Sequence, residues 1–454
     1  MPKKKTALTI EERLQQALVP AEEQPYEVPE NWVWVRLGSL ADVKGGKRLP
    51  KGTTFSENIT KHPYIRVTDF NAIGVSLEGL KYIDEDVYEK ISRYTISSDD
   101  IYVSIAGSIG KVGIIPSCID GANLTENAAK ITNIKGINQK YLCLFLKSEF
   151  AQYQMQSATI ATTQAKLALF RIESLTFPLP PLSEQQRIVE RIEELFAKLD
   201  EAKERLQEVA DSFAVRKAAI LHKAFTGELI GKQVTELVPL ENLVDLIKIG
   251  PFGSSLHESD YIENGIPLVN PKHIVQQRIV PQSKISISDE KAEELSSYKL
   301  KENDIVLGRR GEMGRCAPIS NREENWICGT GSMIIRLKKE YDAKLYSLIL
   351  GSQATVTYLE NSAVGSTLKN LNEKIVRKIP VPQFSNEEQH EIVRLIDDLL
   401  ARERKAQQAT EQALASIDLM KKSILARAFR GELGTNKASE ASALELLKQV
   451  LAEN

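Results

Sequence analysis

Ile188-Val-Glu-Arg-Ile192-Glu-Glu-Leu195 opens a stretch of sequence that this chain of 454 residues contains twice. The first copy ends in Ile220-Leu-His-Lys-Ala-Phe-Thr-Gly-Glu-Leu229. Adding 204 to these numbers gives Ile392-Val-Arg-Leu-Ile396-Asp-Asp-Leu399 and Ile424-Leu-Ala-Arg-Ala-Phe-Arg-Gly-Glu-Leu433. The two stretches share most of their apolar residues and the same closing phrase, which indicates an internal duplication.

The apolar residues of both stretches have the spacing of a coiled coil. In the first copy they recur in steps of four and three, at positions 188, 192, 195, 199, 202, 206, 209, 213 and 220. The second copy keeps the register from Ile392 to Ile424, through Met420, but Glu403 and Thr410 interrupt it. Such a narrow seam predicts two long helices that pair with each other. From 188 to 224, at about 1.5 Å per residue, each would be roughly 55 Å long.

Local signals define both ends of each predicted helix. Proline-rich segments, 178–181 and 380–382, forbid helix upstream. Capping boxes are predicted at Ser183-x-x-Gln186 and Ser385-x-x-Glu388. Gly227 and Gly431 are expected to end the helices.

The segments between the helices are also duplicated, although less clearly. The run Asp100-Ile-Tyr-Val-Ser-Ile-Ala-Gly-Ser-Ile-Gly-Lys111 pairs with Asp304-Ile-Val-Leu-Gly-Arg-Arg-Gly-Glu-Met-Gly-Arg315. Short β-rich runs at 32–36, 101–105, 305–307 and 333–336 alternate with turns, and helices are predicted at 138–156 and 342–359. Each globular segment is therefore expected to be α+β.

The predicted organisation is two globular domains and two long helices, related by a pseudo-twofold internal repeat. The segments are an N-terminal helical extension (1–29), a first globular domain (30–177), a first long helix (178–237), a second globular domain (238–379), a second long helix (380–434) and a C-terminal tail (435–454). We expect the long helices to form an antiparallel coiled coil.

Composition excludes several classes of protein. Basic and acidic residues are balanced at 59 and 61, which argues against a general binder of nucleic acid. No run of 18 apolar residues offers a membrane span, and the N-terminus lacks the apolar core of a signal peptide, so a cytoplasmic protein without a membrane contact is expected. The four cysteines and five histidines have no metal-ligand spacing. No metal site is predicted.

Basic residues nevertheless cluster in each globular domain. From Lys44 to Arg66 there are six basic residues and one acidic residue. Basic side chains on glycine-rich loops suit phosphate contacts, and Arg, Asn and Lys can bind base edges, although a solvated charged loop is the alternative. The candidate DNA-binding residues are Lys44, Lys47, Arg48, Arg66 and Lys111 in the first domain, and Lys248, Asn270, Lys272, Arg309, Arg310 and Arg315 in the second.

No motif for catalysis is recognisable. Gly107-x-x-Gly110-Lys111 and Gly227-x-x-x-Gly231-Lys232 lack the spacing and the Ser/Thr of a phosphate-binding P-loop. No nucleophile has a partner base at a known spacing, and no amino-methyltransferase motif is present. The chain is therefore predicted to have no catalytic residues and no cofactor of its own.

Three sequence motifs of this chain resemble those of the specificity (S) subunits of type I restriction-modification enzymes. They are Pro178-Leu-Pro-Pro-Leu-Ser-Glu-Gln-Gln-Arg-Ile-Val189, the Ala-Phe-x-Gly-Glu-Leu ending of both long helices, and the paired motifs that start at Asp100 and Asp304. Gly250-Pro-Phe-Gly-Ser-Ser-Leu256 and Gly265-Ile-Pro-Leu-Val-Asn270 are also typical of that family.

The resemblance implies that each globular domain is a target recognition domain for one half of a split site in double-stranded DNA. It implies that the coiled coil sets the gap between the halves, and that the partners are two modification (methyltransferase) subunits and two restriction subunits. S-adenosylmethionine, ATP and Mg²⁺ would then bind to those partners. Two alternatives remain: a coiled-coil scaffold that binds only proteins, and a self-contained methyltransferase or nuclease. The target sequence is not readable from the chain, because base choice depends on loop geometry.

Overall fold

The chain folds into two compact units, in a computed structural model that describes residues 9–71, 74–157, 166–252, 255–362 and 370–453. Unit 1 comprises residues 1–206 with 413–454, and unit 2 comprises 207–412. Each unit contains one globular domain together with parts of two long helices, α6 (Leu182–Phe225) and α11 (Asn386–Ala428). Across the described residues, every helix is too short or too polar to cross a membrane.

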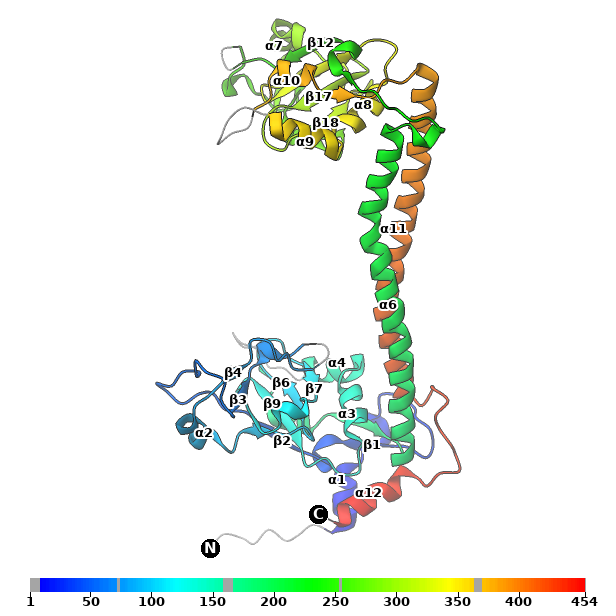
Figure 1. Cartoon of the computed structure of the whole chain (residues 1–454). Coiled ribbons are helices and arrows are strands. Elements are labelled where there is room, and N and C mark those ends of the chain that lie inside the picture. The colour runs from blue at the N-terminus through cyan, green and yellow to red at the C-terminus, as the bar shows by residue number, and fades with distance from the viewer. Residues whose placement is uncertain (1–8, 72–73, 158–165, 253–254, 363–369, 454) are drawn as a thin grey trace. The chain divides into compact units, whose positions relative to one another are not determined.

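The globular domain of unit 1 contains two four-stranded sheets (Figure 1). The first is antiparallel with the order β2-β9-β6-β7, and the second has the order β4-β3-β8-β5, in which β3 and β8 are parallel. The strands are β2 (Asp42–Gly45), β3 (Pro63–Ile65), β4 (Lys81–Tyr82), β5 (Thr95–Ile96), β6 (Ile101–Ser104), β7 (Val112–Gly113), β8 (Ala122–Leu124) and β9 (Ala128–Thr132). A separate pair, β1 (Val33–Arg36) and β10 (Thr176–Leu179), joins the start of the domain to its end.

Unit 2 repeats the topology of the main sheet and three strands of the second sheet. Its main sheet has the order β12-β20-β17-β18, and its second has the order β16-β13-β19. Ile101 faces Ile131 in unit 1, and Ile305 faces Ile335 in unit 2, so both partners are displaced by 204. The strands are β11 (Val238–Pro239), β12 (Val244–Ile249), β13 (Ile266–Val269), β14 (Ile274–Val275), β15 (Arg278–Ile279), β16 (Ser286–Ile287), β17 (Asp304–Gly308), β18 (Cys316–Pro318), β19 (Ile327–Cys328), β20 (Ser332–Leu337) and β21 (Pro380–Val381).

Helices cover the sheets in both units and complete mixed helix and strand domains. They are α2 (Glu85–Ile91), α3 (Gln139–Leu146), α4 (Glu149–Ser157) and α5 (Leu169–Glu173) in unit 1, and α7 (Asp289–Glu294), α8 (Ala343–Leu350), α9 (Gln353–Ser362) and α10 (Glu373–Arg377) in unit 2. The stretches predicted to be helical at 138–156 and 342–359 are helical in the structure, and each consists of two helices. The chain turns at Lys147-Ser148 and at Gly351-Ser352, where hydroxyls of Ser148 and Ser352 accept from the first turn of the next helix.

The predicted ends of the long helices are only partly correct. The Ser385 capping box is present, because the Ser385 N–H donates to Glu388 at 2.8 Å and the Glu388 N–H donates to the Ser385 hydroxyl at 3.3 Å. The box at Ser183 is absent: α6 already begins at Leu182, and the Pro181 carbonyl accepts from the N–H groups of Glu184 and Gln185. Gly227 and Gly431 follow the helix ends with φ of 81° and 74°, as predicted.

Buried glutamines attach each long helix to the globular domain of its unit. The side chain of Gln185 accepts from the Asn138 N–H at 2.7 Å and donates to the carbonyls of Gly136 and Pro180. Gln389 makes the equivalent bonds to Asp342, Glu340 and Phe384 in unit 2. Both side chains are fully buried, so the start of each long helix is part of a domain core.

Contacts between α6 and α11 run in opposite directions along the two helices in unit 1. In unit 1, Lys203 pairs with Asp418 and Asp200 with Lys421. In unit 2, Arg216 Nε lies 3.0 Å from Glu403, so the polar interruption of the seam has a charged partner. Met420 was predicted to lie in the seam but is exposed. Lys421 lies on that face instead, over the ring of Phe196.

Two short helices, one from the predicted N-terminal extension and one from the C-terminal tail, lie in unit 1. Figure 1 shows α1 (Ile10–Ala17) in blue beside α12 (Ala443–Ala452) in red. Arg13 donates to the Leu451 carbonyl at 3.1 Å, and Arg187 holds Glu440 through two hydrogen bonds of 2.8 Å. The tail therefore belongs to the fold of unit 1.

Candidate nucleic-acid interface

The duplicated glycine motif forms a tight connection between two paired strands in each unit. Gly107 and Gly110 connect β6 to β7 with φ of 74° and 89°, and Gly311 and Gly314 connect β17 to β18 with φ of 82° and 75°. Residues other than glycine rarely adopt such angles, which explains the motif. The motif ends in Lys111 or Arg315, so a basic residue follows the same tight connection in each domain.

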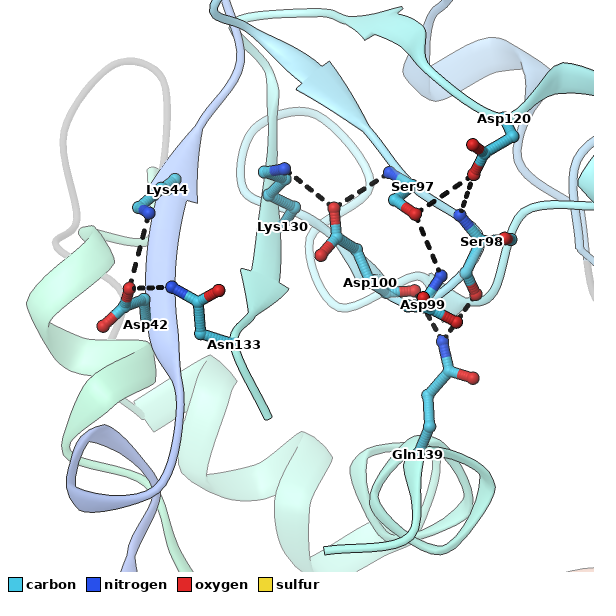
Figure 2. A network of polar contacts seen from close by, with 10 residues as sticks. All are labelled: Asp42, Lys44, Ser97, Ser98, Asp99, Asp100, Asp120, Lys130, Asn133 and Gln139. Carbon is cyan, nitrogen blue, oxygen red and sulfur yellow. Dashed lines mark hydrogen bonds and ion pairs between the residues drawn. The ribbon is translucent and has the colours of Figure 1, made fainter. Parts of the chain in front are cut away.

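The aspartate that opens the motif is a structural anchor. Asp100 is buried, and it accepts from the Ser97 N–H at 2.9 Å and from Lys130 Nζ at 2.8 Å (Figure 2). Figure 2 also shows Gln139, on α3, donating to the carbonyls of Ser98 and Asp100. In unit 2, Asp304 is held by two bonds from Arg336 at 2.8 and 2.7 Å.

Three of the candidate residues in unit 1 line two neighbouring clefts. Lys47 and Arg48, which follow β2, line a cleft of about 710 Å³ together with Lys166. Arg48 and Arg66 line a second cleft of about 400 Å³, and Glu126 borders both clefts. Arg48 and Glu126 form an ion pair at 3.1 Å. These residues make a cationic surface that the structure brings together from β2, β3 and the β8–β9 turn.

Arg66 is held more firmly than the other cations of this surface. Its Nε and Nη2 donate to Asp69 at 3.1 and 2.6 Å, and its guanidinium lies 5.9 Å from the ring centroid of Phe55. Arg66 also precedes the short helix η3 (Val67–Asp69) as its N-cap residue. A side chain fixed in this way loses little conformational entropy on binding.

Lys44 and Lys111 do not line these clefts. Lys44 lies on β2, 3.4 Å from Asp42, which also accepts from Asn133 (Figure 2). Lys111 donates to the Phe70 carbonyl at 3.1 Å.

In unit 2 three candidates converge around Pro271. Asn270 is the N-cap residue of η8 (Pro271–His273), and its side-chain oxygen accepts from the Gly331 N–H at 3.5 Å. Arg315 donates to the Pro271 carbonyl at 3.3 Å. The Arg309 N–H donates to the Gly331 carbonyl.

The other candidates of unit 2 differ in their exposure. Lys272 and Arg310 are exposed. Arg309 is 6% exposed, its Nε donates to Asn370 at 3.1 Å, and its Nη1 has no hydrogen-bond partner among the described residues. Burial and the neighbouring Arg310 lower the pKa of Arg309. Lys248 lies over the ring of Tyr298, 4.4 Å from its centroid.

Six of the candidates occupy matching positions in the two units. At the offset of 204 residues, Lys44 corresponds to Lys248, Arg66 to Asn270 and Lys111 to Arg315. Tyr94 and Tyr298 match in the same way, and each lies beneath a lysine, Lys47 or Lys248. The duplicated frame therefore presents polar side chains at the same places, while their chemistry differs between the domains.

Sequence reasoning missed Glu126 and Lys166, which also line the clefts. Neither has a local signal, because each is a single charged residue that only the fold brings near Arg48. Of the sequence motif that begins at Gly250, residues 253 and 254 lie outside the described part of the chain.

The described residues also bear on catalysis and metal binding. His, Cys, Asp and Glu side chains among them form no group of three or more that could hold a metal ion. Burial raises the pKa of the Cys143 and Cys316 thiols, that of Cys316 to about 12, which makes them poor nucleophiles.

Comparison with known proteins gives a consistent result for both halves of the chain. A family model, "Type I restriction modification DNA specificity domain", matches residues 29–211 and again residues 241–413. The chain is 26% identical to the type I restriction enzyme EcoBI specificity subunit of Escherichia coli, over 94% of this chain and 93% of that protein. It is 24% identical to the EcoKI specificity subunit of Escherichia coli, over 94% of this chain and 96% of that protein.

Solved structures support the same fold. The chain matches the crystal structure of an HsdS subunit from Thermoanaerobacter tengcongensis with a TM-score of 0.64 and 20% identity, over 90% of this chain and all of that one. A second match, to a chain in a structure of the type I R-M system, has a TM-score of 0.65 and 19% identity, with the same coverage.

Proposed function

The chain belongs to the family of type I restriction-modification DNA specificity domains, and we propose that it is the DNA-recognition subunit of such a complex. The observation that carries this proposal is that the specificity domain occurs twice, with most of each match in a different structural unit. The membership disfavours the alternative of a scaffold that binds only proteins. It also agrees with the prediction of a subunit that recognises DNA and leaves catalysis to its partners.

Each globular domain, in this proposal, binds one half of a bipartite target. The matching positions of the candidate residues support this reading, because one frame offers Arg66 in one domain and Asn270 in the other. Arginine pairs best with guanine and asparagine with adenine in the major groove, so the two domains would select different half-sites. The full set of candidates remains a prediction.

The long helices, in the same proposal, form an antiparallel coiled coil about a pseudo-twofold axis, set the unread gap and dock two modification and two restriction subunits. The opposite direction of the α6 and α11 contacts in unit 1 supports the antiparallel pairing. S-adenosylmethionine, ATP and Mg²⁺ would be bound by the partner subunits, which would methylate adenine and cleave DNA.

Reconstitution tests the proposal directly. The purified chain, its modification subunit and the two combined are each incubated with plasmid DNA and S-adenosylmethionine, and methylated adenines are mapped by single-molecule sequencing. We expect a bipartite motif only for the combination. Methylation by the chain alone, or a pattern that does not depend on the chain, would sink the proposal.

A further inference from the structure

The turn between β8 and β9 is held rigidly at the border of the two clefts in unit 1. The Thr125 N–H donates to Ile65, and the Asn127 carbonyl accepts from Ile105 and Ala106. Gly46 approaches so closely that a Cβ there would lie 2.1 Å from the Thr125 carbonyl oxygen. This contact requires glycine, and two residues farther along Arg48 forms its ion pair with Glu126.

Glu126 is the only acidic side chain among the described residues that line either cleft. The same residues include four cations: Lys47, Arg48, Arg66 and Lys166. Basic residues alone would suit a surface that binds the phosphate backbone. A carboxylate repels phosphate, so contacts with the phosphate backbone alone do not account for Glu126, which is ion-paired with Arg48.

The contacts of Glu126 leave it able to accept another hydrogen bond. Its Oε1 accepts from Arg48 Nε at 3.1 Å, and its Oε2 accepts from the Thr125 hydroxyl at 3.0 Å. An ionised carboxylate offers about four lone-pair sites, so each oxygen retains acceptor capacity. The Glu126 side chain is 26% exposed and that of Arg48 is 76% exposed, so both are open to a ligand.

The paired groups match one base pair better than the others. In the major groove, cytosine presents an N4 amine, which a carboxylate accepts from, and guanine presents O6 and N7, which arginine binds. Adenine also has an amine, but arginine's best partner is guanine. We propose that Glu126 and Arg48 together select one guanine–cytosine pair in the half-site of unit 1, an inference that rests on the function proposed above.

The inference predicts an effect on one half-site only. In unit 2 the same turn is present, because the Gly329 N–H donates to Val269 and Gly250 approaches the Gly329 carbonyl as Gly46 approaches Thr125. Its residue at the position of Glu126 is Thr330, which carries no charge. The half-site of unit 2 therefore serves as an internal control.

The first test maps the methylated motif of the complex built with Glu126→Gln. One guanine–cytosine position of one half-site should lose roughly 5- to 150-fold in discrimination, the fold-change that corresponds to about 1–3 kcal/mol. The other half-site and the gap should not change. Glu23→Gln is the matched control, since Glu23 is an exposed acid that pairs with Arg36 and lines neither cleft.

The outcomes separate this inference from the proposed function. If the wild-type complex yields no bipartite motif, the proposed function fails. If it yields one and Glu126→Gln keeps every guanine–cytosine requirement, the inference alone is overturned. Glu126→Asp, which retains the carboxylate, should show a smaller effect than Glu126→Gln, and this comparison controls for a variant that fails to fold.

A second test distinguishes contact with the base from mere positioning of Arg48. DNA affinity is measured for wild type and Glu126→Gln, on the target and on a target whose cytosine lacks the N4 amine. If Glu126 accepts a hydrogen bond from that amine, the variant on the altered target should lose little more DNA affinity than either change alone. Additive losses would show that the carboxylate does not contact the amine, and would overturn the inference.

Discussion

Arg309 and Arg310 are adjacent in the sequence, but they differ in burial and therefore in their effect on the stability of the folded chain. Arg309 is buried, and its Nη1 has no hydrogen-bond partner in the part of the chain that the structure describes, whereas Arg310 is exposed. A buried charge without a counter-ion destabilises a protein, and such groups persist where a ligand uses them. An acceptor on DNA would supply the missing partner.

We therefore expect the two arginines to respond differently to substitution. Arg309→Met should raise the thermal unfolding midpoint of the free chain and lower its DNA affinity in the complex. Arg310→Ala should leave the midpoint unchanged and weaken binding by about 1–3 kcal/mol if it contacts a guanine edge. Calorimetry and DNA titration measure these effects, and unchanged affinity for Arg309→Met would remove it from the DNA-binding set.

Glu184 and Glu388 occupy equivalent positions, but the fold shifts the pKa values of their carboxyl groups in opposite directions. Burial raises the pKa of Glu184, which accepts from Trp32 at 2.7 Å and Asn436 at 2.9 Å. The Lys232 ammonium, 2.7 Å away, lowers the pKa of Glu388. The stability from Glu184 is present below its unfolded pKa and is lost as pH rises through the folded pKa. The stability from Glu388 is present above its unfolded pKa and is lost as pH falls through the folded pKa.

This difference gives a prediction for two matched substitutions. Glu184→Gln should raise the unfolding midpoint relative to wild type at pH 7 and lose that advantage near pH 4, because the amide keeps an acceptor for Trp32. Glu388→Gln should lower the midpoint at pH 7, with the difference shrinking in acid. Thermal unfolding between pH 3 and 8 measures both, and parallel curves for the two variants would contradict the assignment.

At the scale of the element, the ion pair between Arg216 and Glu403 accounts for one of the two polar residues that interrupt the seam of α11. Arg216→Ala leaves Glu403 without its partner, and Glu403→Ala leaves Arg216 over the Phe213 ring. The side chains are partly exposed, so a double-mutant cycle should give a coupling of about 0.5–1 kcal/mol that weakens in high salt. A coupling of zero at low salt would mean that the pair does not stabilise α6 against α11.

At the scale of the whole molecule, the long helices are expected to act as a ruler. The proposed variant lacks residues 199–205 and 416–422, one heptad from each helix, so the heptad register is preserved. Both partners of the ion pairs Lys203–Asp418 and Asp200–Lys421 are removed together, so neither partner is left unpaired. Each helix shortens by about 10 Å, which corresponds to roughly three base pairs. Three base pairs also rotate one half-site by about 100° relative to the other, so affinity should fall.

Motif mapping with the shortened complex checks this expectation. Both half-site sequences should stay the same while the gap contracts. A complex that keeps the original gap at full activity would show that the helices do not set the spacing.

The sequence by itself determined the duplication, the two long helices, the four strands β1, β6, β17 and β20, and the family. These features follow from repeated local patterns, such as the heptads, the closing Gly-Glu-Leu and the glycines of the β6–β7 connection, and each pattern is complete within a short stretch. The sequence also indicated basic clusters, because charge is countable along the chain.

Only the tertiary structure decided which of those charges are partnered. Arg309 is buried, Met420 is exposed while Lys421 lies over Phe196, and Glu126 pairs with Arg48 from a turn 78 residues away. None of these facts has a local signal, because burial and ion pairing depend on which strands become neighbours. The same reason explains the lost Ser183 cap: the contacts of Gln185 with its domain fix where α6 begins, and local capping preference is too weak to override them.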